Sequence, residues 1–406
     1  MDATYSLGEP RVLISRSALL HNVAVLRRSL DENTRICAIL KADAYGHGAD
    51  LVADTLCNFA TEGSLRPPID AVAVASLDEA AEMPEIALPI IIFRPLENVF
   101  IGRQRRKIEL AVRSGWTMTV CTVSAAEDVA RVAMSCGKRA AVQVMVDTGM
   151  MRSGALLQDL DDVLDHIAAR PSLRLAGVCT HFASAENCDN GFTAEQTARF
   201  RSATDTVPER FRGRVLRHAA NSAAVFLHPD AHFDMVRPGL ALYGIDPMGQ
   251  PCTERPLRPV LKWTAPLIAI KTARKGVCVG YGQTWQAPRD TRIGLIPVGY
   301  ADGYPRCMSN RGVVLIDGKP APVAGRVSMD LLTVDLGQVP GAKVGDEVTL
   351  LDDDPLSQAS IYKLAEWSET IPYEVTCRIG QRIERVAIEP ATMGISSGAM
   401  DLTSAP

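Results

Sequence analysis

Seven side chains that can form covalent imines, transfer protons or bind anions lie within, at the end of or soon after short apolar runs of the sequence. They are Lys41, Arg152, His181, His218, Asn221, Ser222 and Arg237. If these runs are parallel β-strands closed into a barrel, their carboxyl ends meet at one mouth, which is where the chemistry of such barrels is located. We therefore predict that the seven side chains, although scattered through the sequence, converge on one site.

Lys41 ends the apolar run Arg35–Lys41 and has no acidic residue directly beside it. Burying an ammonium group costs several kcal/mol unless the group is paired or neutral. Burial lowers the pKa of a lysine, which suits it to Schiff-base chemistry. The alternative is a lysine whose amine reaches out to solvent. The position alone favours neither interpretation.

The elements that must position these side chains repeat one rhythm over the first 245 residues, in which a short apolar run precedes a longer amphipathic stretch. The runs are Arg35–Lys41, Ala71–Ser76, Ile90–Phe93, Thr117–Thr122, Ala141–Asp147, Ala176–His181, Val215–Ala219 and Met235–Tyr243. Most lack clean alternation, which is typical of strands buried on both faces. Eight such units predict an α/β fold, a parallel (β/α)8 barrel. An open doubly wound sheet is the main alternative.

Amphipathic stretches between the runs predict helices at Asp50–Phe59, Ser76–Met83, Ser124–Met134, Leu157–Ala169 and Ala194–Thr204. Two of them begin with the same pattern. Ser76 with Glu79, and Ser124 with Glu127, have the spacing of a capping box, in which a serine and a glutamate satisfy each other's free backbone N–H groups. We predict that both pairs cap their helices.

After about residue 256 the sequence predicts a second, mostly-β domain. Short strands are expected at Lys262–Thr272, Gly276–Tyr281, Arg292–Val298, Val313–Ile316, Val323–Val327, Leu332–Leu336 and Glu347–Leu351. Turn signals such as Asp317–Gly318 separate them, and one helix is expected near Ser357–Trp367. The predicted domains are 12–255 and 256–388, with residues 1–11 as a candidate to pack on the second. Residues 389–406 are rich in Gly, Ser, Ala and Pro and are expected to be a mobile tail.

The composition of the 406 residues excludes several classes of protein. Lys and Arg number 43 and Asp and Glu 47, which is not the basic footprint of a nucleic-acid-binding protein. No apolar run approaches the roughly 18–20 residues that span a membrane, and Met1–Pro10 does not resemble a secretory signal. There are ten cysteines and no C-x-x-C pair. Cys37, Cys136, Cys179 and Cys278 stand singly in apolar surroundings, which predicts buried, reduced thiols and a cytoplasmic protein.

The segment 41–48, Lys-Ala-Asp-Ala-Tyr-Gly-His-Gly, resembles the pyridoxal-phosphate lysine signature of alanine racemases. The resemblance continues in order along nearly the whole chain. Further matching segments are 147–154 (Asp-Thr-Gly-Met-Met-Arg-Ser-Gly), 180–183 (Thr-His-Phe-Ala), 220–222 (Ala-Asn-Ser), 237–244 (Arg-Pro-Gly-Leu-Ala-Leu-Tyr-Gly), 280–282, 299–304, 325–330 and 371–374. One such motif would be weak evidence of a relationship. A series of motifs in the same order from Lys41 to Arg385 makes chance agreement improbable.

The resemblance implies a fold-type III racemase that interconverts L-alanine and D-alanine through an aldimine of pyridoxal 5'-phosphate and supplies D-alanine for peptidoglycan. It also implies a head-to-tail homodimer whose active sites are shared between subunits. Lys41 would be one base, and Tyr281 from the partner subunit would be the opposed base. A free tyrosine has a pKa of about 10, so neighbouring cationic groups would have to lower it. His181 would be the hydrogen-bonding neighbour of this tyrosine.

The resemblance also assigns residues that bind the cofactor and the substrate. Arg237 would face the pyridine nitrogen, and because arginine keeps its proton it would leave the ring a weaker electron sink. The phosphate would be held by Tyr45, Ser222, Tyr373 and the backbone N–H groups of Gly239 and Leu240. Asn221 would orient His218 or other groups behind the site. The substrate carboxylate would meet Arg152 and the N–H of Met329 from the partner, and Tyr300 would narrow the entrance.

Position 145 departs from the family pattern, because many members carry there a lysine whose carbamate holds the arginine that corresponds to Arg152. Met145 cannot form a carbamate, so another group must orient Arg152. Ser328 replaces a frequent cysteine, which is a mild change.

Three alternatives to an alanine racemase remain open from the sequence. One is a racemase for serine or another amino acid, since one methylene is worth only about 1–3 kcal/mol in a pocket. A decarboxylase of the same fold type would need a β-domain cysteine–acid site and a Gly-rich phosphate loop after the histidine segment, and neither is found. A non-catalytic pyridoxal-phosphate carrier would not need the β domain or Tyr281.

Overall fold

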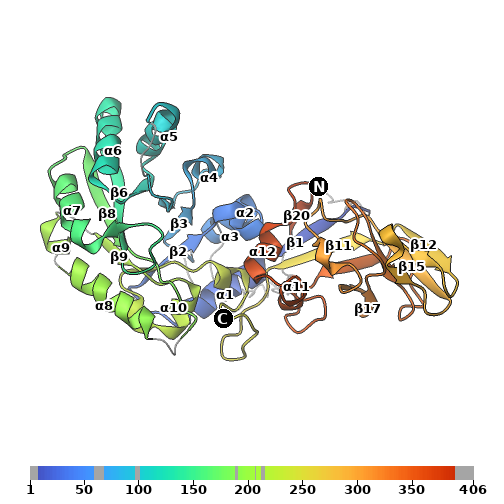
Figure 1. Cartoon of the computed structure of the whole chain (residues 1–406). Helices are drawn as coiled ribbons and strands as arrows, with labels where there is room; N and C mark the ends of the chain where they lie inside the picture. Colours follow the sequence, from blue (N-terminus) through green and yellow to red (C-terminus); the bar gives the residue numbers. More distant parts are fainter. Residues whose placement is uncertain are drawn as a thin grey trace, which may run out of the picture.

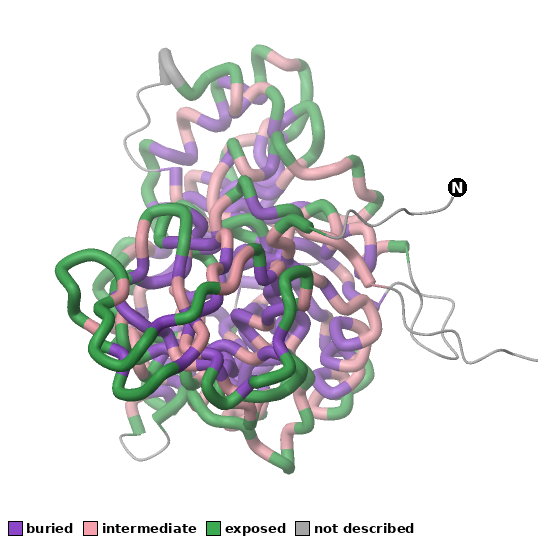
Figure 2. The backbone as a smooth tube through the Cα atoms, turned by 90° about the vertical axis from the view of Figure 1, so that its right-hand side faces the viewer, coloured by how far each residue is buried: buried purple, intermediate pink, exposed green. Residues whose placement is uncertain are grey.

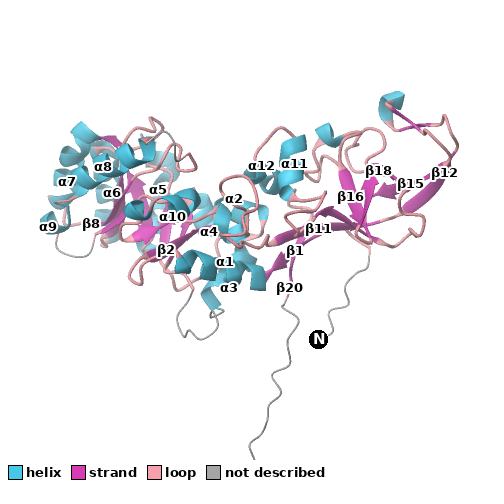
Figure 3. Ribbon diagram, turned by 90° about the horizontal axis from the view of Figure 1, so that it is seen from below, coloured by secondary structure: helices cyan, strands magenta, loops and turns pink. Residues whose placement is uncertain are grey.

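The computed structural model describes residues 8–58, 68–96, 101–187, 191–205, 207–211 and 215–388. The chain forms a barrel and a β-rich part that lie side by side along one long axis (Figure 1, Figure 3). Three strands lie between them in both views, namely β1 (Arg11–Ser15), β11 (Leu261–Pro266) and β20 (Glu384–Ile388). The expected tail, residues 389–406, lies outside the described residues.

Eight parallel strands form the barrel, in the order β2 (Arg35–Ile39), β3 (Ala71–Val74), β4 (Ile90–Ile92), β5 (Thr117–Val120), β6 (Ala140–Asp147), β8 (Leu173–Cys179), β9 (Leu216–His218) and β10 (Met235–Val236). β10 pairs with β2, and β7 (Ala155–Leu156) pairs with β6. Between β9 and β10, Asp234 N–H donates to the Arg217 carbonyl (3.0 Å) and Arg237 N–H to the Ala220 carbonyl (2.8 Å). These bonds close the ring, so the predicted barrel is confirmed and an open sheet is ruled out.

The strands are buried as their unbroken apolar runs predict. Every residue of β3, β4 and β5 is buried, as are the first seven residues of β6. The eighth run is shorter than predicted, since the strand ends at Val236 and Leu240–Tyr243 form a 3₁₀ turn, η4. Pro238 lacks an N–H group and cannot extend the ladder, so the chain leaves the sheet there.

Helices surround the barrel and bury their apolar faces against it (Figure 1). They are α1 (Arg16–Arg28), α3 (Ala49–Asn58), α4 (Leu77–Glu82), α5 (Ile101–Ser114), α6 (Val123–Cys136), α7 (Leu160–Ala168), α8 (Phe192–Thr204), α9 (Val207–Arg210) and α10 (Ser222–Leu227), with 3₁₀ turns η1 (Leu157–Asp159) and η3 (Pro229–Ala231). The capping box of α4 is confirmed. Ser76 Oγ accepts from Glu79 N–H and the Glu79 carboxylate accepts from Ser76 N–H, each at 3.2 Å.

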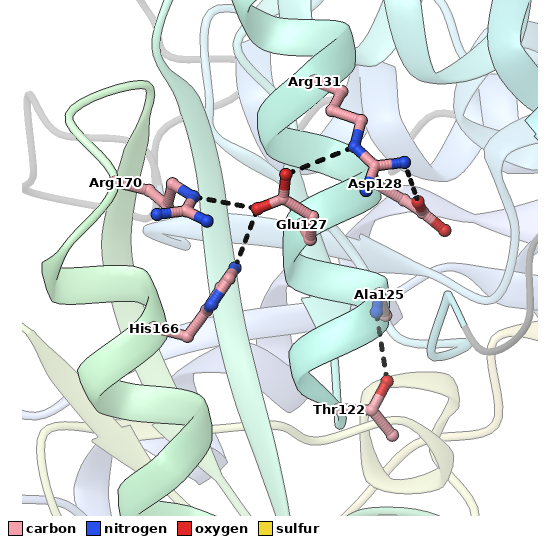
Figure 4. A network of polar contacts seen from close by, with 7 residues as sticks. All are labelled: Thr122, Ala125, Glu127, Asp128, Arg131, His166 and Arg170. Atoms are coloured by element: carbon pink, nitrogen blue, oxygen red, sulfur yellow. Dashed lines mark hydrogen bonds and ion pairs between the residues drawn. The ribbon is translucent and has the colours of Figure 1, made fainter.

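The predicted capping box of α6 is wrong. The helix begins one residue before Ser124, and its cap is Thr122, whose Oγ1 accepts from Ala125 N–H at 3.1 Å. Thr122 takes the extended conformation at the end of β5 that a capping residue needs. Glu127 is therefore beyond reach of the helix start and instead binds Arg131, His166 and Arg170 (Figure 4).

The β-rich part contains a six-stranded sheet in the order β17 (Lys319–Pro322), β16 (Val313–Ile316), β19 (Glu347–Leu351), β11 (Leu261–Pro266), β1 (Arg11–Ser15) and β20 (Glu384–Ile388). A three-stranded sheet follows the order β12 (Ala269–Ala273), β15 (Thr291–Ile296), β18 (Leu332–Asp335), and β13 (Cys278–Val279) pairs with β14 (Trp285–Gln286). The helices here are α11 (Ile361–Trp367) and α12 (Pro372–Cys377), with 3₁₀ turns η5 (Tyr281–Gln283) and η6 (Arg306–Met308). Since β1 belongs to this sheet, the expected boundary at residue 12 falls inside a strand.

Two predictions for this part are corrected. The run Lys262–Thr272 is not one strand, because β11 and β12 belong to different sheets and the chain turns between them. Val323–Val327 is not a strand, since Gly325 has a positive φ of 90° and Val323 makes an isolated bridge. The turn at Asp317–Gly318 is confirmed. Both residues have positive φ, as the hairpin between β16 and β17 requires.

The buried backbone segments lie in the interior, and the turns of the β-rich part are exposed (Figure 2). Cys37 and Cys179 are buried as predicted, but Cys136 is half-buried and Cys278 is exposed. Cys278 begins the short two-stranded hairpin formed by β13 and β14. Within the described segments, no helix combines the length and the apolar character needed to cross a membrane.

Candidate active site

A cavity of about 360 Å³ lies where the barrel strands end. Its volume is in the range of small-molecule sites. It is lined by ten of the residues predicted for the site, namely Lys41, Tyr45, Arg152, His181, Asn221, Ser222, Arg237, Gly239, Leu240 and Tyr373. The first nine come from the barrel and Tyr373 from α12. The closed barrel therefore brings together side chains that are up to 332 residues apart (Lys41 to Tyr373).

Lys41 begins an unusual turn, labelled α2 (Lys41–Gly46), directly after β2. The four residues 42–45 all have φ between 53° and 56°, so the turn is left-handed. Each residue of L configuration pays roughly 1–2 kcal/mol in this conformation. Such a turn persists only where surrounding contacts enforce it, and strain of this kind collects at functional sites.

Contacts with the β-rich part hold this turn in place. Gly46 lies so close to the Thr376 carbonyl of α12 that a Cβ atom would be 2.1 Å from the oxygen. Arg385 Nε donates to the Gly46 carbonyl at 3.2 Å. The Tyr45 ring packs against Tyr373 at 5.6 Å between centroids. The β-rich part of the same chain thus supports the segment that carries Lys41.

The pKa of Lys41 is lowered, first by burial and then by the positive charge of Arg152. Glu79 and Cys377 act in the opposite direction. An amine with a lowered pKa carries more of the unprotonated form near neutrality, which is the form that attacks a carbonyl.

Arg237 lines the cavity and is otherwise almost fully buried. Its Nη2 donates to the carbonyls of Thr180 (2.7 Å) and Ala219 (3.0 Å), and Nη1 donates to His218 Nδ1 (3.0 Å). Its guanidinium group lies 5.1 Å from the centre of the Phe93 ring. No carboxylate pairs with Arg237 within the described residues. The guanidinium is therefore positioned by neutral groups and keeps its charge for the cavity.

The two histidines beside Arg237 are neutral. Burial and the positive charge of Arg237 lower the pKa of His181 to about 3 and that of His218 well below its usual value. His181 Nδ1 lies 3.3 Å from Arg237 Nη2. Because arginine can only donate, both Nδ1 atoms must accept, and the proton of each ring is on Nε2. His181 therefore offers an N–H donor on the side of its ring away from Arg237.

Donors suited to a phosphate group gather around Ser222 and Gly239. Ser222 Oγ accepts from Gly239 N–H (2.9 Å) and Ala241 N–H (3.2 Å), so its own proton is left for an acceptor outside this loop. The predicted Gly239 N–H is thus already used, whereas Leu240 N–H has no acceptor in the described chain. A Cβ atom at residue 239 would lie 2.5 Å from the Tyr45 hydroxyl. Glycine at this position therefore leaves room for the Tyr45 phenol at the cavity. Burial raises the pKa of Tyr45 and of Tyr373, which keeps both phenols protonated donors.

Arg152 is exposed at the cavity, and the described residues offer it no hydrogen bond or ion pair. The thioether of Met145 is buried and accepts from the Ser153 hydroxyl at 3.4 Å. A thioether carries no negative charge, so it cannot hold a guanidinium group as a carboxylate would. The structure therefore leaves the Arg152 side chain available to a ligand anion.

Four predicted site residues do not line this cavity. One is His218, whose Nδ1 accepts from Arg237. Tyr281, Met329 and Tyr300 lie in the β-rich part and are 72%, 55% and 42% exposed. Tyr300 N–H donates to the Ser328 carbonyl (3.0 Å), which places the Tyr300 and Met329 loops side by side. The N–H of Met329 has no acceptor within the described residues. One chain thus presents two separate groups of predicted site residues.

Sequence reasoning missed Phe93, which lines the cavity and covers Arg237 and, at 6.2 Å, the edge of His218. Phe93 is the last residue of a predicted strand, so the strand-end rule applied to apolar residues would have found it. The resemblance predicts that Asn221 orients His218 or other groups behind the site, but no hydrogen bond joins it to His218 within the described residues. Asn221 Oδ1 accepts from Ala224 N–H at 3.0 Å and caps α10, while His218 is held by Arg237.

Comparison with known proteins adds independent information. Residues 14–247 match the alanine racemase N-terminal domain and residues 260–387 match the alanine racemase C-terminal domain. An alanine racemase of Chlorobaculum tepidum is 38% identical over 376 residues, which cover 93% of this chain and 94% of the relative.

Solved structures show the same relationship. An alanine racemase of Clostridium difficile 630 superimposes with a TM-score of 0.85 at 31% identity, covering 96% of this chain and 97% of that one. An alanine racemase from Bartonella henselae with covalently bound pyridoxal phosphate gives a TM-score of 0.79 at 27% identity, with coverage of 94% and 99%.

Proposed function

The chain belongs to the alanine racemase family, and from this premise we propose that it interconverts L-alanine and D-alanine with pyridoxal phosphate as its cofactor. The observation that carries the proposal is the cavity in which Lys41, Arg237 and Ser222 meet. The bound cofactor would supply an electron-withdrawing ring that makes the α-hydrogen of an attached amino acid acidic. A serine racemase on the same scaffold is the second candidate, because serine is only one hydroxyl larger.

The cavity residues fit this cofactor. Lys41 would hold it covalently through Nζ. The Ser222 hydroxyl, the Leu240 N–H and the phenols of Tyr45 and Tyr373 would bind its phosphate, with Gly239 allowing the close approach. Asn221 would complete the lining. Arg237 would donate to the ring nitrogen without giving up its proton, which favours proton return to the α-carbon over side reactions.

Inversion requires proton removal on one face of the substrate and delivery on the other. Lys41 Nζ would act on one face. Tyr281 of the partner subunit would act on the opposite face, in a homodimer whose active sites are shared between subunits. Tyr281 is exposed in a single chain, so its side chain is available to enter the cavity of the other subunit. The Nε2–H of His181 would donate a hydrogen bond to the Tyr281 oxygen and would stabilise its phenolate form.

The substrate carboxylate would bind Arg152 and the N–H of the partner's Met329, and the partner's Tyr300 would restrict the entrance to small side chains. The carboxylate would then supply the negative charge that Met145 cannot offer Arg152. We assign the product to peptidoglycan synthesis in the cytoplasm. The cofactor domain would be the barrel, which follows β1 and extends to about residue 255. Residues 256–388, together with β1, would form the domain that supplies the second base.

Mixing two inactive variants tests the shared site. The rate of alanine racemisation should fall at least a thousandfold in the Lys41→Ala homodimer. It should fall at least tenfold in the Tyr281→Phe homodimer. A random mixture of subunits contains about half hybrids, each with one intact site, so it should recover about a quarter of the wild-type rate. Mass-labelled subunits verify the exchange. No recovery despite exchange would count against sharing, and activity in Lys41→Ala would overturn the lysine assignment. Parallel assays with L-alanine and L-serine separate the two candidate substrates.

A further inference from the structure

Glu79 does not line the cavity, and the function proposed above does not use it. Its carboxylate does more than cap α4. Oε2 accepts from Ser76 N–H and also from Ala75 N–H at 2.5 Å, at the end of β3. Oε1 accepts from Ala42 N–H at 3.1 Å. One carboxylate therefore joins the start of α4, the end of β3 and the residue that follows Lys41.

The Glu79 carboxylate connects β2 and β3 beyond the point where their backbone hydrogen bonds end. The last bond between β2 and β3 is from Leu40 N–H to the Ala73 carbonyl at 2.8 Å. Beyond it the chain enters the left-handed turn at Ala42 and no longer runs as a strand. The Glu79 carboxylate spans the two diverging segments. Hydrogen bonds from backbone N–H groups to an ionised acceptor are roughly twice as strong as neutral ones, which suits the carboxylate to enforce a strained backbone.

We propose that Glu79 is a positioning residue for Lys41: its carboxylate fixes the left-handed turn at Ala42 to the end of β3 and thereby holds the Lys41 amine in the cavity. The inference rests on the proposed function of Lys41. Glu79 does not line the cavity that contains Lys41, so it acts through the turn and not on the substrate. Its charge also counteracts the lowering of the Lys41 pKa by burial and Arg152.

The two halves of the capping box allow a matched test. Ser76→Ala removes the hydroxyl that caps α4 and leaves the carboxylate on Ala42. Glu79→Gln keeps the size of the side chain but removes the charge and one of the two acceptor oxygens. Both variants weaken the start of α4, whereas only Glu79→Gln weakens the link to Ala42.

The full-length variants are loaded with pyridoxal phosphate and assayed with alanine. Glu79→Gln should lower kcat about tenfold with KM for alanine within twofold, because the amine is displaced while the substrate contacts remain. Ser76→Ala should keep kcat within twofold. Hydrogen exchange resolved at the Ala42 amide should be at least fivefold faster in Glu79→Gln and unchanged in Ser76→Ala.

Normal kcat and normal Ala42 exchange in Glu79→Gln would overturn the inference, and so would equal losses of kcat in both variants, since the effect would then come from α4. If Glu79→Gln is poorly folded, Glu79→Asp replaces it, and its shorter carboxylate should give the same faster exchange at Ala42. The proposed function fails separately, through activity that persists in Lys41→Ala, and the exchange measurement does not depend on that result.

Discussion

The helices α4 and α6 begin with the same sequence pattern and use it for different purposes. In α4, Ser76 and Glu79 form the capping box, and the Glu79 carboxylate also reaches the turn after Lys41. In α6, Ser124 does not cap the helix, and Glu127 faces the neighbouring helix α7 (Figure 4). A glutamate at the same spacing therefore serves the active-site end of the barrel in one helix and helix–helix packing in the other.

A shift of one residue in the helix start explains the difference. α4 starts directly after Ser76, so Glu79 is the third residue of the helix and can reach back to the cap. α6 starts at Val123, after Thr122, so Glu127 is the fifth residue. Its side chain then points toward His166 on α7 and Arg170 just after the end of α7. Position within the first turn decides which partners a glutamate can reach.

Glu127→Ala should give the largest loss of stability in this comparison. Three groups would lose their acceptor, namely Arg131 Nε (3.2 Å), His166 Nε2 (3.1 Å) and Arg170 Nε (2.8 Å). The network is partly exposed, so we expect a loss of about 1–2 kcal/mol. Urea unfolding of the holoenzyme measures it, with kcat as the control. A fall in kcat beyond twofold would contradict the separation of the two glutamates.

Lowering the pH should remove part of the stabilisation that Glu127 provides. Hydrogen bonds from Arg170 and Arg131 hold the pKa of Glu127 below its usual value. A carboxylate with a lowered folded-state pKa stabilises the protein above the unfolded-state value, about 4.3, and this stabilisation is lost as the pH falls through the folded-state pKa. The difference in unfolding midpoint between the wild type and Glu127→Gln should therefore be constant from pH 7 to about 5.5 and shrink toward pH 4. A difference that grows on acidification would refute the assignment.

The sequence could predict the parts of this fold and site that depend on local signals, but not those that depend on contacts between distant residues. Runs of buried residues predicted eight strands, and a serine at the end of β3 predicted the cap of α4, because both signals are local. The cap of α6 could not be chosen, because Thr122 and Ser124 are both able to cap and only the end of β5 decides between them. The left-handed turn after Lys41 opposes local preference and depends on α12 and Glu79, which are distant in sequence.

The smallest expected effect separates the two candidate caps of α6. Thr122→Ala removes the acceptor of Ala125 N–H and should cost about 1 kcal/mol, as loss of a helix cap does. Ser124→Ala removes an exposed hydroxyl in the first turn and should change stability by less than about 0.5 kcal/mol. Both variants remove a hydroxyl group near the start of α6, and Thr122→Ala also removes a methyl group from an exposed side chain, so their unfolding midpoints can be compared. If Ser124→Ala were the more damaging, the helix would start at the serine and Glu127 would be in reach of its cap, which would remove the physical reason for the difference between α4 and α6.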